Sequence, residues 1–194
     1  MHKGMIFTEK DSNIEANEDT KIILREKNIS LILDSYDDLF SDFDPRPYSV
    51  RGLSDDFLIE CRRAVRTLKT ESPVLELRLL VPKNKRKTTK ETMIKKRLKE
   101  YFQNQLKEKQ IELKQLRREG AKWIFIGFSL ALTSSLLLTQ KDFLYSLPLI
   151  ITEPGGWFSF WTGLDKLFIE PKGKMHEFEF FNKMAKMSVR FYSY

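Results

Sequence analysis

The sequence predicts an α+β protein, in which a small cytosolic mixed domain is split by a transmembrane helical hairpin and a long helix leads into the first span. The first observation is the run WIFIGFSLALTSSLLLTQ at residues 123–140, which contains no charged residue and approaches the roughly 20 apolar residues that cross a bilayer core. The second is a pair of strand-like runs, at 74–81 and 188–194, on the two sides of this apolar region. The third is a long helical pattern at 89–119 that leads into the apolar run.

Composition and charge limit the class of protein. With 194 residues, 41% of them hydrophobic, the chain can form a core, so global disorder is excluded. One cysteine and two histidines exclude an intramolecular disulfide and a Cys/His zinc cage. The net charge of +7 is concentrated at residues 61–122, directly before the apolar run. This placement favours a membrane-flanking segment, and nucleic acid is not expected as a partner.

The chain is expected to fall into four segments. A flexible N-terminal arm is followed by the first part of the cytosolic domain, by the transmembrane hairpin, and by a C-terminal helix and strand that complete the domain. The boundaries are 1–20 for the arm, 21–119 for the first part with its basic helix at 89–119, 120–169 for the hairpin and 170–194 for the C-terminal part. Because the C-terminal strand completes the domain, we expect it to pair with the strand at 74–81.

Short patterns predict the elements of the first part. The runs KIILR and ISLIL predict strands at 21–25 and 29–33, and the acidic stretch 34–44 predicts a short helix or turn. Ser54 is a favourable N-cap for a helix that runs to about Lys69. The apolar face of that helix consists of Phe57, Leu58, Cys61, Val65 and Leu68.

Two interpretations remain open for the second apolar segment, FLYSLPLIITEPGGWFSFWTGL at 143–164. In the preferred one, residues 141–153 form a short amphipathic turn and the return helix runs from near Pro154 to about Ile169, since proline is favourable in a first helical turn. Glu153 then lies at the membrane interface. In the alternative, the whole stretch is a kinked spanning helix and Glu153 lies near the middle of the bilayer, where an ionisable group is a functional candidate.

Both interpretations give a hairpin whose ends lie on one side of the membrane. The basic residues that flank it predict a multi-pass protein of the cell inner membrane with both termini cytoplasmic. The long helix is expected to run into the first span with little break, with Gly120 as the only candidate hinge, and a helix at 173–186 is expected after the second span. Tryptophans are expected at the interfaces, and small residues are expected to let the two helices approach closely. The membrane-embedded or interfacial candidates are Trp123, Glu153, Gly155, Gly156, Trp157, Trp161 and Asp165, with Ser159 and Gly163 as further small residues.

The stretch Asp44-Pro45-Arg46-Pro47-Tyr48 is the most unusual short motif, since two prolines fix the backbone around Arg46 and Tyr48. The candidates for ligand or partner binding are Asp42, Asp44, Arg46 and Tyr48, with a rigid connector as the preferred interpretation. No catalytic residue, metal site or cofactor is expected. The acidic stretch lacks the central glycine of an EF-hand loop, and the sequence contains no phosphate-binding glycine loop of the Walker or dinucleotide type.

Several motifs together resemble a family of uncharacterised bacterial two-span membrane proteins: DPRPYSVRGLSDDF at 44–57, GGWFSFW at 155–161, LDKLF at 164–168 and KMAKMSVRF at 183–191. In that family an Asp-Pro-x-Pro-aromatic motif precedes the first span, an aliphatic-Gly-Trp helix with a downstream acidic residue forms the second, and a Met-x-Val strand closes the chain. This chain has Trp161-Thr162-Gly163-Leu164-Asp165 where relatives tend to have Trp-Arg-Pro-Leu-Glu. The resemblance implies a topology and no activity.

We therefore expect a non-enzymatic integral inner-membrane protein that acts as a membrane-anchored interaction or sensory module. Its expected partners are the lipid bilayer, further copies of the chain in a homo-oligomer, and a protein of unknown identity. Two alternatives stay open. One is a membrane-perturbing two-helix effector, and the other is a membrane-face enzyme that uses the acidic cluster near Asp44.

Overall fold

The computed structural model describes residues 28–67, 76–139 and 143–194. The chain divides into two compact units. Unit 1 comprises the residues up to Gln105 together with Phe180–Tyr194, and unit 2 comprises Leu106–Glu179. The predicted arm at 1–20 and the predicted strand at 21–25 lie outside the described residues.

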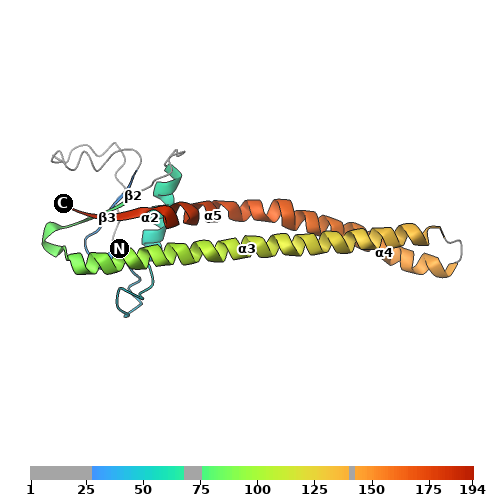
Figure 1. Ribbon diagram of the computed structural model, residues 1–194, viewed down its shortest axis with the longest axis horizontal. Helices are drawn as coiled ribbons and strands as arrows, with labels where there is room; N and C mark the ends of the chain where they lie inside the picture. The colour runs from blue at the N-terminus through green and yellow to red at the C-terminus, as the bar shows by residue number, and fades with distance from the viewer. Residues whose placement is uncertain (1–27, 68–75, 140–142) are drawn as a thin grey trace. The chain divides into compact units, whose positions relative to one another are not determined.

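Unit 1 contains a small parallel sheet of three strands, β1 (Ile29–Ile32), β2 (Glu76–Val81) and β3 (Ser188–Ser193), in that spatial order (Figure 1). Leu77 of β2 pairs with Ile29 on one side and with Val189 on the other. The predicted pairing of the C-terminal strand with the strand at 74–81 is therefore confirmed over 76–81. Parallel neighbours need a crossover connection, and helices supply both crossovers, so the mixed α and β composition predicted from the sequence is present.

The first crossover contains a 3₁₀ helix, η1 (Tyr36–Leu39), and the helix α2 (Asp55–Thr67). Ser35 caps η1, because its side chain accepts a hydrogen bond from the Asp37 N–H while the Asp38 carboxylate accepts one from the Ser35 N–H. On the expected apolar face of α2, Phe57, Leu58, Cys61 and Val65 are buried, and Leu68 lies outside the described residues. Cys61 is fully buried, and this burial raises the pKa of its thiol, as expected for an inert core cysteine.

A turn of 3₁₀ helix, η2 (Lys83–Lys85), follows β2 and leads to the helix α3 (Thr88–Leu137). The first part of α3 contributes the buried side chains Ile94, Leu98 and Phe102 to the core of unit 1. The helix is continuous through Gly120, so the expectation that the long helix runs into the apolar segment with little break is confirmed, and the candidate hinge at this residue is not used. A single glycine disfavours a helix interior by only about 1 kcal/mol, which the surrounding helix formers offset.

The helix α4 (Phe143–Leu164) continues through a π-helical turn, η3 (Asp165–Ile169), into α5 (Glu170–Lys186). The preferred sequence interpretation, with a turn at 141–153 and a helix start near Pro154, is therefore wrong over 143–153, and the helix predicted at 173–186 begins earlier. The helix includes both Pro148 and Pro154. Hydroxyl groups inside α4 donate to backbone carbonyls one turn earlier, among them Thr152 Oγ1 to Pro148 O at 3.0 Å, so these polar side chains are satisfied within the helix.

The core of unit 1 joins all of its elements through aromatic and aliphatic side chains. Phe102 of α3 meets Phe180 of α5 edge to face, with 6.4 Å between ring centroids, and Arg62 of α2 lies over the same Phe180 ring at 5.5 Å. Tyr36 of η1 meets Phe191 of β3 at 5.8 Å. The segments before and after unit 2 thus share one core.

We expect Leu79→Ala to lower the free energy of unfolding of unit 1 by about 2–5 kcal/mol, because it removes methyl groups from the middle strand and leaves a cavity. Leu79 is fully buried, whereas Ile59 on α2 is 42% exposed. Ile59→Ala is the matched control and is expected to have a much smaller effect. Urea unfolding followed by amide hydrogen exchange in β2 measures both, and equal losses would contradict the assigned core.

Candidate functional site

The 41–52 loop, which joins η1 to α2, contains the DPRPY motif and is closed by backbone contacts at its base. Phe40 and Leu53 form an antiparallel bridge, and the Ser41 N–H donates to Gly52 O at 2.9 Å. Inside the loop, Pro47 O accepts hydrogen bonds from two amides, of Val50 and Arg51, both at 2.9 Å. The backbone alone therefore gives this segment a defined conformation.

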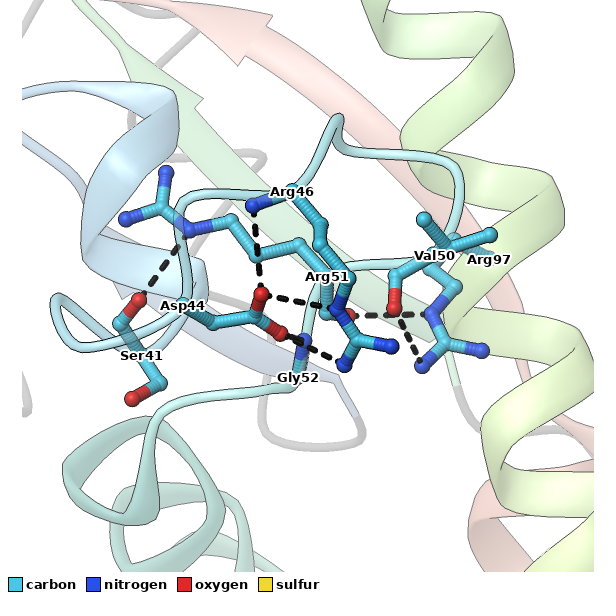
Figure 2. A network of polar contacts seen from close by, with 7 residues as sticks. All are labelled: Ser41, Asp44, Arg46, Val50, Arg51, Gly52 and Arg97. Carbon is cyan, nitrogen blue, oxygen red and sulfur yellow. Dashed lines mark hydrogen bonds and ion pairs between the residues drawn. The ribbon is translucent and has the colours of Figure 1, made fainter.

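Asp44 is the centre of the loop, as Figure 2 shows. Its Oδ1 accepts from Arg46 N at 3.1 Å and from Arg46 Nε at 2.8 Å, and its Oδ2 accepts from Arg46 Nη2 at 2.8 Å and from Gly52 N at 2.7 Å. The hydrogen bond from the Arg46 side chain, followed by the one from Gly52, holds the pKa of Asp44 well below its usual range. The carboxylate is thus ionised, and the four donors that it binds belong to the same loop.

A second carboxylate, that of Asp37, supports the loop from η1. Its Oδ1 accepts from Arg51 Nη1 at 2.8 Å and from the Tyr48 hydroxyl at 3.0 Å. Arg51 Nε also donates to Ser41 O at 3.0 Å, and the Tyr48 ring stacks on Phe40 with 5.1 Å between centroids. Burial, and then the hydrogen bond to Asp37, raise the pKa of Tyr48. The guanidinium and the phenol therefore act as clamps.

The helix α3 contributes a third set of contacts to the loop. Arg97 donates through Nε to Arg51 O at 3.1 Å and through Nη2 to Val50 O at 3.4 Å (Figure 2), and Lys90 lies over the Tyr48 ring at 5.1 Å. Sequence reasoning missed Arg97. It is one of many basic residues in 83–99, and no local pattern separates it from its neighbours.

The structure thus brings three of the four sequence candidates together, since Asp44, Arg46 and Tyr48 belong to one network. Asp42 is exposed on the same loop. The loop also exposes two large side chains, those of Phe43, which is 98% exposed, and of Arg46, which is 61% exposed. A carboxylate with a depressed pKa and four donors is a poor general base. The geometry therefore favours the interpretation of this loop as a rigid connector. The loop would offer a partner a surface of fixed conformation.

A buried polar cluster that the sequence did not reveal fixes the start of α3. Glu91 is 3% exposed, and its carboxylate accepts from Arg86 Nε at 2.8 Å, from Arg86 Nη2 at 3.0 Å and from the Tyr36 hydroxyl at 3.1 Å. The Tyr36 hydroxyl accepts in turn from Lys87 N at 2.9 Å. The hydrogen bonds from Arg86 are the main cause of the lowered pKa of Glu91. A buried charge with such partners is a structural anchor.

In unit 2, the last part of α3 and the helix α4 run antiparallel and nearly touch (Figure 1). A Cβ atom built on Gly127 would lie 2.7 Å from Phe160 N and 2.9 Å from Gly156 O, and one on Gly163 would lie 2.7 Å from Ile124 N. All three distances are shorter than real Cβ contacts, so these two positions require glycine. The expectation that small residues permit close helix packing is confirmed for Gly156 and Gly163.

The same contact continues on both sides of Gly127. Gly120 lies against the Gly163 backbone, and Ser134 Oγ donates to Thr152 Oγ1 at 2.8 Å. On α3 the contact residues Gly120, Gly127 and Ser134 recur every seven residues, which is the spacing of a continuous packing seam along a helix. This seven-residue repeat is visible in the sequence, and it is the signal from which Gly120 could have been predicted as a contact residue. Gly155 is half-exposed, and a Cβ there would have ordinary room, 3.7 Å from Leu130 Cδ1.

The other membrane candidates lie away from this contact. Trp157 and Trp161 are 65% and 53% exposed and meet edge to face at 5.7 Å. Trp123 is half-buried, and Asp165 is exposed in η3. Glu153 is exposed on α4. Together with residues of both helices it lines a shallow groove formed by Ala131, Ser134, Ser135, Leu138, Glu153, Pro154 and Trp157.

Ion pairs connect the α3 segment of unit 2 to η3 and α5. Lys109 of α3 pairs with Glu177 at 2.7 Å, and Glu112 pairs with Lys174. Glu119 pairs with Lys166 at 2.9 Å, and this contact lowers the pKa of Glu119. These pairs continue the antiparallel packing of α3 and its returning partner beyond the glycine contact.

Among the residues that the structure describes, no group of three or more His, Cys, Asp or Glu side chains could hold a metal ion. In the same part of the chain, one helix, α3, is long and apolar enough to cross a membrane, and 17% of its most apolar 18-residue window is buried. No protein-family model matches the chain, and no curated protein or solved structure matches it. The resemblance to two-span bacterial membrane proteins therefore stays a prediction.

We expect Asp44→Asn to speed amide exchange at Gly52 by roughly tenfold or more, because a charge-assisted acceptor is lost. Asp42→Asn, on the same loop, is the matched control and should leave this rate unchanged. In the unaltered chain the pKa of Asp44 is lowered, so its contribution is complete above the unfolded-state pKa of about 4 and is lost only as the pH falls below it. Protection of Gly52 that survived in Asp44→Asn would contradict the role of this carboxylate.

We expect Gly127→Ala and Gly163→Ala to separate α3 from α4 and to destabilise their contact by about 1–3 kcal/mol, because one methyl group overfills it. Gly155→Ala is the matched control and should be tolerated. The readout is disulfide formation in a Ser134→Cys, Thr152→Cys background, where the two hydroxyl oxygens lie 2.8 Å apart. Similar cross-linking yields in all three glycine variants would be inconsistent with this packing.

Proposed function

We propose that this protein is an integral protein of a bacterial inner membrane, inserted as a hairpin of two spans and carrying unit 1 in the cytoplasm as an interaction or sensory module. The observation that carries the proposal is the reversed polarity of the α3–α4 pair. Its closest contacts are made at glycine, serine and threonine residues, and most of its large apolar side chains are exposed on the outer face. In a water-soluble helix pair the polarity runs the other way.

The outer face supports the proposal through its size and continuity. Phe125 and Leu136 on α3 are each 71% exposed, and Ile151 on α4 is 74% exposed. Further exposed apolar residues are Ile126, Phe128, Leu132, Leu138, Phe143, Leu147, Ile150, Trp157, Phe158, Phe160 and Trp161. An apolar patch of this extent marks an interaction with lipid or protein. Small residues inside and large apolar residues outside are the pattern of helices that associate in lipid.

The lengths of the two helices fit a bilayer. Residues 123–138 of the first span and 143–164 of the second extend for about 24 Å and 33 Å at 1.5 Å per residue, against a hydrocarbon core of about 30 Å. Ser134, which contacts Thr152, is close to the last residue of α3, Leu137. This supports a position of Glu153 near the far end of the first span, where a carboxylate is tolerated better than at mid-bilayer.

The charge distribution supports the cytoplasmic location of both termini. Residues 61–122 carry 20 basic and 7 acidic side chains, and Lys166, Lys172 and Lys174 follow the second span. Short flanking segments rich in Lys and Arg stay in the cytoplasm. The two spans cross the membrane in opposite directions. The strands that precede and follow them in the sequence are therefore on the same side of the membrane, where they can form the sheet of unit 1.

The rigid 41–52 loop supports an interaction role for unit 1. Its hydrogen bonds hold Phe43 and the Arg46 guanidinium in exposed positions, so a partner could bind them without ordering the loop first. The small residues of α4, which favoured a homo-oligomer in the sequence, contact α3 of the same chain. A homo-oligomer would therefore have to use the outer apolar faces of the two spans.

We expect the protein to resist carbonate extraction from membranes and to insert with a single orientation, which labelling of introduced thiols can detect. In Thr139→Cys, the thiol at the end of α3 should react with a membrane-impermeant maleimide in intact spheroplasts. In the matched variant Ser49→Cys, on the exposed part of the 41–52 loop, labelling should require permeabilisation. Native Cys61 is fully buried and should contribute little labelling in either variant.

Two results would overturn the proposal. Extraction of the protein as a folded monomer without detergent would remove the membrane assignment. Labelling of Ser49→Cys from outside, with protection of Thr139→Cys, would reverse the topology.

A further inference from the structure

A line of basic side chains leads along α3 into its apolar end. Lys114, Arg118 and Lys122 are spaced by four residues and lie on one face of the helix, and Phe125 and Ile126 continue the same face. We call these five residues the entry stripe. All of them are exposed, Phe125 to 71% and Ile126 to 44%. The stripe thus changes from cationic to apolar at Trp123, where the charge-free run begins.

The cations of the stripe differ from other basic residues of unit 2. Lys109, Lys166 and Lys174 are occupied by ion pairs with carboxylates of the same unit. Within the described residues, Lys114, Arg118 and Lys122 have no carboxylate at ion-pair distance. Glu119, the acidic residue adjacent to Arg118, is paired with Lys166. Lys122 also interacts electrostatically with Glu119, although not at ion-pair distance. The stripe therefore carries cations that no carboxylate contacts directly and that can bind an external anion.

The surface is also hollowed at the point of change. Arg118, Ala121, Lys122, Phe125 and Ile126 line a shallow, open depression whose surface is almost wholly apolar. The depression therefore accepts hydrocarbon, while Arg118 and Lys122 are exposed residues with charged ends. A ligand that uses both features carries a phosphate or similar anion at one end and hydrocarbon at the other.

We propose that the entry stripe is a binding site for an anionic phospholipid of the cytoplasmic leaflet, with the headgroup phosphate on Arg118 and Lys122 and an acyl chain along Phe125 and Ile126. Arginine binds phosphate oxygens through two donors at once, and lysine adds a point charge. The order of cations before the apolar residues matches the order of headgroup and tail in a leaflet. Nucleic acid would leave the apolar depression without a partner.

This inference rests on the proposed membrane insertion, and one experiment separates the two. The chain has three tryptophans, so Trp157→Phe with Trp161→Phe leaves Trp123, one residue after Lys122, as a local reporter. The protein is reconstituted into phosphatidylcholine vesicles that contain a minor fraction of either brominated phosphatidylglycerol or brominated phosphatidylcholine. Bromine on the acyl chain quenches tryptophan only at short range, so quenching reports the lipid that occupies the depression.

We expect phosphatidylglycerol to be enriched next to Trp123 by roughly fivefold for each basic residue that contacts it. Arg118→Gln with Lys122→Gln should make the two brominated lipids equally effective. Lys99→Gln with Lys107→Gln removes the same charge from the same helix farther from the apolar run and should keep the preference. Circular dichroism checks that each variant is folded.

Each outcome has one meaning. Failure of the unaltered protein to float with the vesicles would overturn the membrane assignment itself. Flotation with equal quenching by both lipids would overturn the lipid site alone. Loss of the preference in the control pair as well, or its persistence in the Arg118 and Lys122 variant, would also overturn the site, since the preference would then not depend on the stripe.

Discussion

The contact between the backbones of α3 and α4 is the constraint on which the character of unit 2 depends. At Gly127 the opposite helix leaves no room for a Cβ atom, so large side chains cannot lie between the two helices. The large apolar residues are therefore on the outside, where Phe125 and Ile151 are mostly exposed. A surface of this kind is stable in hydrocarbon and unstable in water. The membrane proposal thus follows from packing as well as from hydropathy.

Unit 1 has an apolar core, and a few carboxylates that each bind several donors fix its loop and helix ends. Asp44 organises the 41–52 loop, Asp37 attaches that loop to η1, and Glu91 attaches η1 to the start of α3. Lowered carboxyl pKa values at Asp44 and Glu91 mean that these contacts are present at neutral pH and weaken in acid. An exposed surface built on such contacts is fixed before any partner arrives.

Much of unit 1 was predictable because its signals are local. Alternating and β-branched runs predicted β1, β2 and β3, and Ser54 followed by an apolar stripe predicted α2. The polar contacts of the loop were not predictable in detail, because Arg97 reaches it from a helix 46 residues after Arg51. The spacing of residues in the sequence does not indicate a contact between residues so far apart in the chain.

The error in unit 2 concerns Pro154, which was treated as a helix start because proline is favourable in a first helical turn. The helix α4 instead begins at Phe143 and includes both Pro148 and Pro154. Gly120, the one candidate hinge of the long helix, packs against Gly163 within a continuous α3. In apolar helices, proline and glycine are therefore weaker evidence for a helix end than they are in water-soluble ones.

The order of the strands has a consequence for biosynthesis. The middle strand β2 obtains its second neighbour only from β3, and residues 82–187 separate the two. While the ribosome synthesises that segment, β2 has an open hydrogen-bonding edge, a state in which nascent chains are prone to mispair and aggregate. A ribosome-associated chaperone would be of greatest benefit during this interval.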